Sequence, residues 1–369
     1  MRQDVAPLVP QRVQHRAHAS RGPVERHDAG WSRPRPSRSS RGRETAVIRR
    51  RDALALAPAL LARPAAAQGS WAPSRPVTLL VPFPPGGATD LCARAVQPGL
   101  TGLLGQPVVV ENRPGATGVT GTRYVAGLPG DGHVLLFNAS GTMTIQPLVM
   151  ARPGFDPVRD LKAVTLAMSA PNVVAVHPGL PVRTVGELQE WMLAQRDGVS
   201  FASSGVGSSE QLGMELLLLR TGARGVHVPF PGGAPAITAV MSGQVPVTMV
   251  NSGTAGPQIA AGQLRAIAVA GPRRITVAPD VPTLAEAGYP DLFSVSWTGV
   301  FLPASTPDPI ADRLNTVLVA ALRAPEVVER LARIGFTVEA SSREDLTRLA
   351  ATDLARWRGV VRDAQIKVN

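Results

Sequence analysis

The chain has a single cysteine, Cys92, so no internal disulfide can form, and a chain of 369 residues does not depend on one. Cys92 lies in an apolar helical run, which predicts a small buried core residue rather than a catalytic thiol. Histidine is also scarce beyond residue 67, where only His133, His177 and His227 occur, isolated from one another in sequence. The sequence therefore predicts no metal site and no cofactor.

Motifs of common enzyme classes are missing as well. The chain has no Gly-Lys-Ser/Thr nucleotide loop, no Gly-x-Ser-x-Gly nucleophile elbow and no His-Glu-x-x-His zinc helix. Residues 205–207 would begin a dinucleotide fingerprint, but Glu210 occupies the place of its last glycine. Serines at 203, 204, 208 and 209 leave a serine nucleophile open, although the sequence shows no partner base. A protein that is not an enzyme is predicted.

The formal net charge of +11 is unevenly distributed. Residues 1–67 hold 14 arginines and five acidic residues, a net charge of +9, whereas the remainder holds 24 basic and 22 acidic residues, a net charge of +2. The remainder has no basic stripe, so a nucleic-acid partner is not expected.

The basic N-terminal part has the features of an export leader. Residues 1–46 are rich in Arg, Pro, Ser and His without apolar periodicity, which predicts disorder or a start codon placed too far upstream. Residues 47–67 contain three consecutive arginines, a short apolar run at 53–61 and small residues up to Ala67. This pattern predicts a signal peptide, of the general rather than the twin-arginine type, cleaved near Ala67, and a periplasmic location.

Two similar glycine-rich segments stand out in the remainder. Residues 81–90 read V-P-F-P-P-G-G-A-T-D, between an apolar run and a helical pattern. A strand, a tight turn and a helix start in this order present free backbone N–H groups and the positive end of the helix dipole, which suit an anion. Residues 228–234 repeat the string with one proline fewer, about 147 positions later. The repeat predicts two similar α/β lobes with an anion in the cleft between them.

Apolar runs and capping signals predict strands alternating with helices, in α/β layers around mainly parallel sheets. The expected strands are 77–81, 106–111, 134–137, 163–168, 172–176, 199–202, 245–250, 264–270 and 295–302. The expected helices are 89–104, 119–126, 184–195, 210–220, 235–241, 308–322, 325–334 and 341–361. Pro98-Gly99 should kink or break the first helix, and residues 138–142 should form a polar loop.

Uncharged donors in the loops at the strand ends could together hold a carboxylate by charge-assisted hydrogen bonds. Each residue alone could instead be a cap or turn residue, and Asp90 in particular could cap its helix or order its loop. The predicted ligand-binding residues are Pro85, Gly86, Gly87, Ala88, Thr89, Asp90, Thr117, Asn138, Ser140, Ser203, Ser208, Ser209, Gly232, Gly233 and Asn251.

The chain resembles the Bug family, the extracytoplasmic substrate-binding receptors of tripartite tricarboxylate transporters. The resemblance covers residues 71 to about 367. The segments that match the family in order and spacing are residues 75–90, 105–116, 129–132, 202–205, 232–236 and 280–288. It implies a type II periplasmic-binding-protein fold, with two Rossmann-like lobes joined by crossing strands and a ligand cleft between them. Residues 71–172 plus 294–369 would form lobe 1, and residues 173–293 lobe 2. It also implies a carboxylate ligand held by main-chain groups of residues 86–90.

Three positions depart from the family pattern. Gln211 stands where the family often has histidine, Pro231 where lysine is usual, and Asn251 where aspartate is usual. These departures leave the ligand open, and the missing lysine makes a second strongly anionic group on the ligand less expected. The resemblance implies a monomeric receptor that delivers a small organic acid to inner-membrane transporter subunits. A ligand sensor for a membrane signalling partner and an exported hydrolase are the alternatives.

Overall fold

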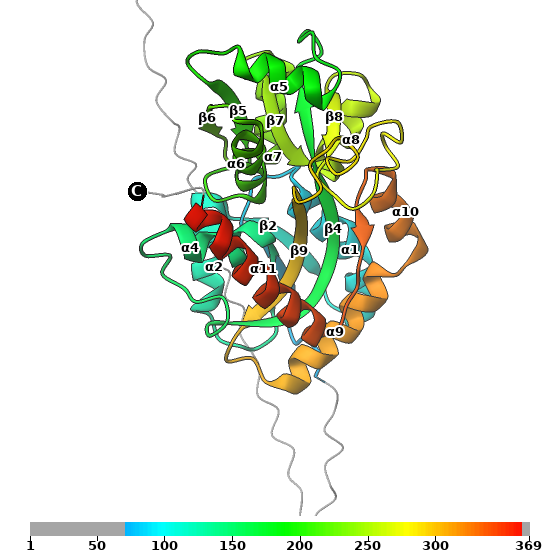
Figure 1. The fold of residues 1–369 in the computed structure, drawn as a ribbon. Coiled ribbons are helices and arrows are strands. Elements are labelled where there is room, and N and C mark those ends of the chain that lie inside the picture. Colours follow the sequence, from blue (N-terminus) through cyan, green and yellow to red (C-terminus); the bar gives the residue numbers. More distant parts are fainter. Residues whose placement is uncertain (1–70, 364–369) are drawn as a thin grey trace, which may run out of the picture. The chain divides into compact units, whose positions relative to one another are not determined.

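The structure, a computed structural model, describes residues 71–363. Figure 1 shows these residues as helices packed around a long, continuous sheet system. The predictions of disorder or a misplaced start in residues 1–46, and of a signal peptide at 47–67, lie outside the described residues.

The ten strands of the described part follow the order β2-β1-β3-β9-β4-β7-β5-β6, and β8 and β10 also pair with β4. The strands are β1 (Val77–Val81), β2 (Val108–Asn112), β3 (Val134–Ala139), β4 (Leu161–Val176), β5 (Val199–Ser203), β6 (Gly225–Pro229), β7 (Val247–Asn251), β8 (Arg265–Val269), β9 (Val295–Pro303) and β10 (Thr337–Val338). Pairs among β1–β3 and among β5–β7 are parallel, whereas every pair that includes β4 or β9 is antiparallel. The prediction of mainly parallel sheets is therefore wrong for the centre of the sheet.

The long strand β4 joins the two halves of the molecule. It combines the two runs predicted as separate strands, because pairing continues without a break from one partner to the next. Its residues up to Pro171 pair with β9, and its residues from Asn172 pair with β7. We call β1–β3, β9 and β10 with α1–α4 and α9–α11 the first lobe, and β5–β8 with α5–α8 the second lobe. The lobe boundaries at 172/173 and 293/294 remain predictions.

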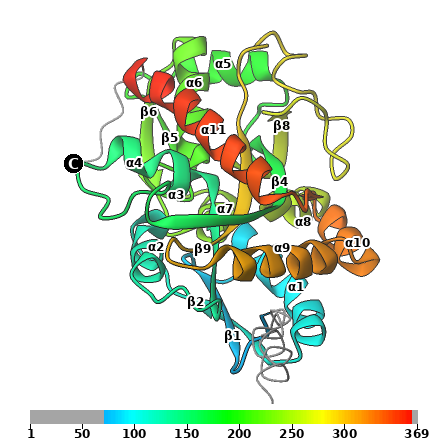
Figure 2. The same cartoon turned by 90° about the horizontal axis from the view of Figure 1, so that it is seen from below.

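The helices cover both faces of the sheet system (Figures 1 and 2). They are α1 (Ala88–Leu104), α2 (Val119–Ala126), α3 (Ser140–Thr144), α4 (Gln146–Val149), α5 (Val185–Leu193), α6 (Ser209–Thr221), α7 (Gly233–Met241), α8 (Ser252–Ala260), α9 (Asp308–Leu322), α10 (Pro325–Arg333) and α11 (Arg343–Asp363), with a 3-10 turn at Ala116–Gly118. Among them, none combines the length and the apolar character needed to cross a lipid bilayer. Figure 2 shows α11 running diagonally across the molecule beside β4.

Capping explains where two helices of the second lobe begin. Thr184 and Glu187 form a capping box at the start of α5. At α6, Ser208 accepts a hydrogen bond from the backbone N–H of Gln211, but the Gln211 side chain bonds the N–H of Gly207 instead of completing the box.

Two local predictions in the first lobe, a break of α1 at Pro98 and a polar loop at residues 138–142, are wrong. Helix α1 continues through Pro98 without a break. Its neighbour Gly99 faces Ala321 of α9, since a Cβ there would lie in ordinary contact, 3.6 Å from the Cβ of Ala321. Residues 138–142 are not a loop: they complete β3 and begin α3, because Asn138 pairs with Gly299 of β9.

Each lobe has its own main apolar core. In the first lobe, Leu79 of β1 and Leu318 of α9 are fully buried, and in the second lobe so are Leu188 of α5 and Met214 of α6. Cys92 is buried in the first core, and burial raises the pKa of its thiol to about 12. The prediction that Cys92 is a small buried core residue is confirmed.

Candidate ligand-binding site

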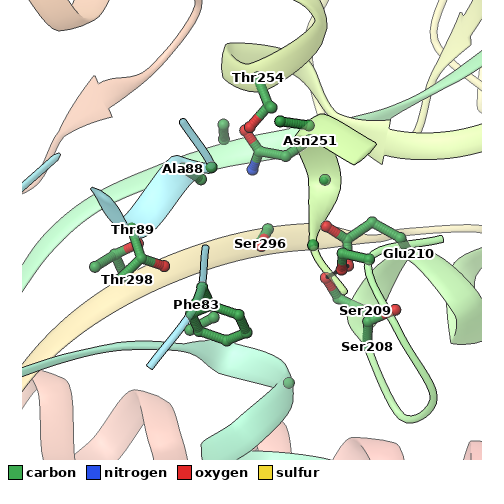
Figure 3. Close-up of a pocket in the computed structure, with 18 of the residues that line it drawn as sticks. Phe83, Ala88, Thr89, Ser208, Ser209, Glu210, Asn251, Thr254, Ser296 and Thr298 are labelled. Carbon is green, nitrogen blue, oxygen red and sulfur yellow. Dashed lines mark hydrogen bonds between the residues drawn. The ribbon is translucent and has the colours of Figure 1, made fainter. Parts of the chain in front are cut away.

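A cavity lies between the lobes, and segments from both line it (Figure 3). The cavity is lined by short segments of each lobe. The first lobe contributes residues 83–85, residues 87–89, Thr117, Ala139, Gly141 and Thr142, and the second contributes Ser204, residues 208–210 and residues 232–235. The cavity offers about 60 Å³ to the centres of water-sized spheres, several times the space that one water molecule needs. It therefore suits a molecule of a few heavy atoms.

Four helices of eight residues or more begin at this cavity. The N-cap residues Gly87 of α1, Ser208 of α6, Gly232 of α7 and Asn251 of α8 all line it. Unpaired backbone N–H groups and the positive ends of helix dipoles therefore meet around one space. No Lys, Arg or His side chain is among its lining residues in the described part of the chain. What this cavity offers to an anion is therefore helix starts and their dipoles rather than cationic side chains.

The two glycine-rich joints touch each other across the cleft. A Cβ built on Gly86 would lie 3.9 Å from the Cβ of Ala234, and one built on Gly232 would lie 3.4 Å from Cδ of Pro84. The starts of α1 and α7 thus form one continuous rim of the cavity. The sequence repeat predicted that each joint offers a helix N-terminus, and the fold brings these two termini side by side.

A buried aspartate holds the first joint in shape. The Asp90 carboxylate accepts hydrogen bonds of 2.9 Å from the backbone N–H of Gly86, from Nε of Arg94 and from Nδ2 of Asn112. Burial works to raise the pKa of Asp90, but the hydrogen bonds from Arg94, Gly86 and Asn112 and the charge of Arg94 together hold it below its ordinary value. Asp90 does not line the cavity, so its place in the structure is that of a residue that orders the loop.

Most of the predicted ligand-binding residues come together at the cavity. Those that line it are Pro85, Gly87, Ala88, Thr89, Thr117, Ser208, Ser209, Gly232, Gly233 and Asn251. Thr117 adopts a left-handed conformation with φ of 49°, and its carbonyl accepts a hydrogen bond of 2.8 Å from the Thr142 hydroxyl. Contact of these ten residues with a ligand remains a prediction.

The other five predicted residues do not line the cavity, since their polar groups are engaged within the fold. They are Gly86, Asp90, Asn138, Ser140 and Ser203. The Asn138 amide donates to the Thr122 hydroxyl at 2.8 Å, and the buried Ser140 hydroxyl accepts from the backbone N–H of Trp297 at 3.4 Å.

Ser203 has a histidine partner that the sequence did not reveal. Its hydroxyl lies 2.7 Å from Nε2 of His227, whose ring stacks on Phe201 with the ring centroids 5.1 Å apart. Burial lowers the pKa of His227 to about 4, so the ring is neutral at neutral pH. Because Ser203 is buried and does not line the cavity, this pair has no access to a substrate there. Residues 71–363 also contain no group of three or more His, Cys, Asp or Glu that could hold a metal.

Sequence reasoning missed the floor and one acid of the cavity. The floor consists of residues 168–170 of β4 and 296–298 of β9, which pair with each other, and Phe336 adds an aromatic edge. Small polar residues within the otherwise apolar β9 were a weak signal for this surface. The acid is Glu210, whose side chain is buried and lies on the opposite side of the cavity from Ala88 and Thr89 (Figure 3).

Known proteins match the chain over most of its length. Residues 92–366 match the family model described as "Tripartite tricarboxylate transporter family receptor". Protein BugT of Bordetella pertussis is 36% identical over 297 residues, which cover 80% of this chain and 91% of that protein. The structure of the periplasmic binding protein BugD superposes with a TM-score of 0.76 at 31% identity, covering 80% of this chain and 99% of that one.

Two further solved structures carry ligands in their descriptions. A protein of R. palustris with adipate gives a TM-score of 0.77 at 34% identity, covering 80% of this chain and 99% of that one. MatC from Rhodopseudomonas palustris with bound malate gives a TM-score of 0.75 at 32% identity, covering 78% and 99%. These superpositions confirm the predicted α/β periplasmic-binding-protein fold.

Proposed function

This chain belongs to the tripartite tricarboxylate transporter receptor family and is a periplasmic solute-binding protein rather than an enzyme, and we propose that it captures a small organic acid in the cavity between its lobes. The proposal includes delivery of that acid to inner-membrane transporter subunits by a monomeric receptor. It also includes export with a signal peptide at 47–67, for which the basic and apolar segments of the leader are the support.

The observation that carries the proposal is the set of helix starts around a cavity without cations. A carboxylate placed at the rim formed by the starts of α1 and α7 would accept hydrogen bonds from backbone N–H groups and lie at the positive ends of two helix dipoles. Gly87 and Gly233 carry no side chain that could occupy this place. Relatives solved with adipate and malate, both carboxylates, support the same ligand class.

Binding would favour the closed arrangement of the lobes. The lobes already contact each other beside the cavity, where Nε2 of Gln146 in the first lobe donates to the carbonyl of Val206 in the second. A ligand held by residues of both lobes binds the closed form better than the open one and so shifts the population toward it.

Thermal unfolding of the purified protein against a panel of mono-, di- and tricarboxylates, acidic amino acids and aromatic acids tests the proposal. A ligand at 100 times its dissociation constant adds about 2.7 kcal/mol, which should raise the unfolding midpoint by roughly 5 °C. The panel should be repeated after unfolding and refolding, which removes any ligand retained from the cell. A flat response from the refolded protein would contradict the proposal.

A further inference from the structure

Glu210 is an acid inside a cavity that otherwise favours anions. It is the second residue of α6, its exposed fraction is 8%, and its carboxylate lines the cavity. No other Asp or Glu and no cationic side chain lines the cavity within residues 71–363. No ion pair of the described residues includes Glu210. The charge of this carboxylate is therefore not balanced by the protein.

The carboxylate of Glu210 takes the place that a ligand anion would have at the start of α6. It accepts hydrogen bonds from the hydroxyls of Ser204 at 2.8 Å and Ser209 at 3.3 Å. Its own backbone N–H and the Ser208 hydroxyl also favour its charged form, although burial dominates and raises its pKa. Glu210 therefore occupies the start of α6, and in its charged form it also repels a second anion there.

The remaining anion site lies on the far side of the cavity. Figure 3 shows Ala88 and Thr89, at the start of α1, across the cavity from Glu210. A bound acid with its carboxylate at the start of α1 would direct its other end toward the start of α6. That end would meet a carboxylate and serine hydroxyls, which together favour a cation or a hydrogen-bond donor.

We propose that Glu210 selects a compact acid with one carboxylate and, at its other end, an ammonium or another hydrogen-bond donor, and that it disfavours a second carboxylate. The inference rests on the proposed function, because it assumes that the first carboxylate binds at the start of α1. Position 231 agrees with it: proline there supplies no cation that could offset two acids facing each other. The ligand class therefore differs from that of the relatives solved with adipate and malate.

Calorimetric titration with acids matched in length tests this selection. The pairs are succinate with 3-aminopropanoate, glutarate with 4-aminobutanoate, and adipate with 5-aminopentanoate, measured at pH 7.5. For the amino acid that binds best, the wild-type protein should show an affinity at least tenfold higher than for the dicarboxylate of the same pair. Glu210→Gln, which keeps the shape of the side chain and removes its charge, should reduce that preference at least tenfold. The control Glu215→Gln, on the same helix but outside the cavity lining, should leave the preference unchanged.

The outcomes separate this inference from the proposed function. If the wild-type protein binds a dicarboxylate more tightly than the amino acid of the same pair, the proposed role of Glu210 is overturned. The proposed binding of carboxylates is then unaffected. This result needs no variant, so it holds even where Glu210→Gln fails to fold. A ratio within threefold of wild type in a folded Glu210→Gln protein would also overturn it. Absence of binding to all six acids would overturn the inference, whereas the proposed function would fall only if the wider panel of acids also gave no response.

Discussion

The indole Nε1 of Trp297 donates a hydrogen bond of 2.6 Å to the carboxylate of Asp353. Trp297 lies on β9 and lines the cavity, whereas Asp353 lies on α11, the C-terminal helix. Both side chains are buried, and burial raises the pKa of Asp353 although the bond from Trp297 and the charge of Arg356 oppose this. The floor of the cavity is thus fixed by a helix that contributes no residue to its lining.

Replacing this aspartate should loosen the floor of the cavity. Asp353→Ala leaves the indole N–H buried and unpaired, which should lower the free energy of unfolding by about 1–3 kcal/mol and weaken ligand binding. Asp353→Asn keeps an acceptor and should cost less. Denaturant unfolding measures the first effect and calorimetry the second. The control is Glu344→Ala, which removes an exposed acid from the same helix. Equal stabilities of Asp353→Ala and this control would contradict the account.

Gly87→Val should abolish binding without unfolding the protein. The backbone of Gly87 is extended, with φ of −80°, and a Cβ there would meet nothing closer than the Pro84 carbonyl at 3.9 Å, so valine fits the fold. Its methyl groups would crowd the start of α1, where the carboxylate is proposed to bind. Affinity should fall at least a hundredfold, measured by calorimetry. The matched change Gly102→Val, at an exposed position of the same helix, should leave affinity intact. Unchanged affinity in Gly87→Val would remove α1 from the site.

Local sequence was sufficient where a feature depends on near neighbours. The joint at 81–90 and the cap Ser208 were predictable because a turn, a cap and the next helix lie within a few residues. The position of Trp297 was not, because it depends on the pairing of β9 with β4, more than a hundred residues earlier. Glu210 was visible only as a departure from a nucleotide fingerprint. That its carboxylate faces α1 across the cavity follows from how the lobes meet, which local sequence does not encode.

Asp90 should stabilise the first joint, and its contribution should be lost in acid. Since its pKa in the folded protein is lowered, its stabilisation is present above the ordinary pKa of 3.8 and disappears as pH falls through the folded value. Asp90→Asn removes the charge that the hydrogen bonds from Arg94 and Asn112 favour. We expect a loss of about 2–3 kcal/mol at pH 7, by denaturant unfolding. A loss no larger than that in Asp197→Asn, an exposed aspartate, would show that the network does not hold the loop.

His227 should make the fold sensitive to mild acid. Its pKa is lowered to about 4 in the folded protein, whereas the unfolded chain takes up a proton below pH 6.5. The unfolded state therefore binds more protons between these values, and stability falls as pH drops from about 6.5 to 4. We expect a loss of about 1–2 kcal/mol, allowing for solvent screening of a half-buried ring. In His227→Gln, which keeps a partner for the Ser203 hydroxyl, this part of the pH dependence should vanish. If this variant loses as much stability between pH 6.5 and 4 as the wild-type protein, His227 is excluded as the source of that loss.

Glu210 should lower the stability of the unliganded protein at neutral pH. Since burial raises its pKa in the folded state, its protonated form is favoured by folding: full stability is present below the ordinary pKa of 4.5 and is lost as pH rises through the folded value. Glu210→Gln should therefore raise the free energy of unfolding by about 1 kcal/mol at pH 7.5, and the gain should shrink toward pH 4. Unfolding by denaturant at the two pH values measures both effects. A variant less stable than wild type at pH 7.5 would mean that the serine hydrogen bonds outweigh burial and that Glu210 supports the fold. A gain would mean that the charge is kept against the stability of the fold, as expected of a residue retained for the ligand.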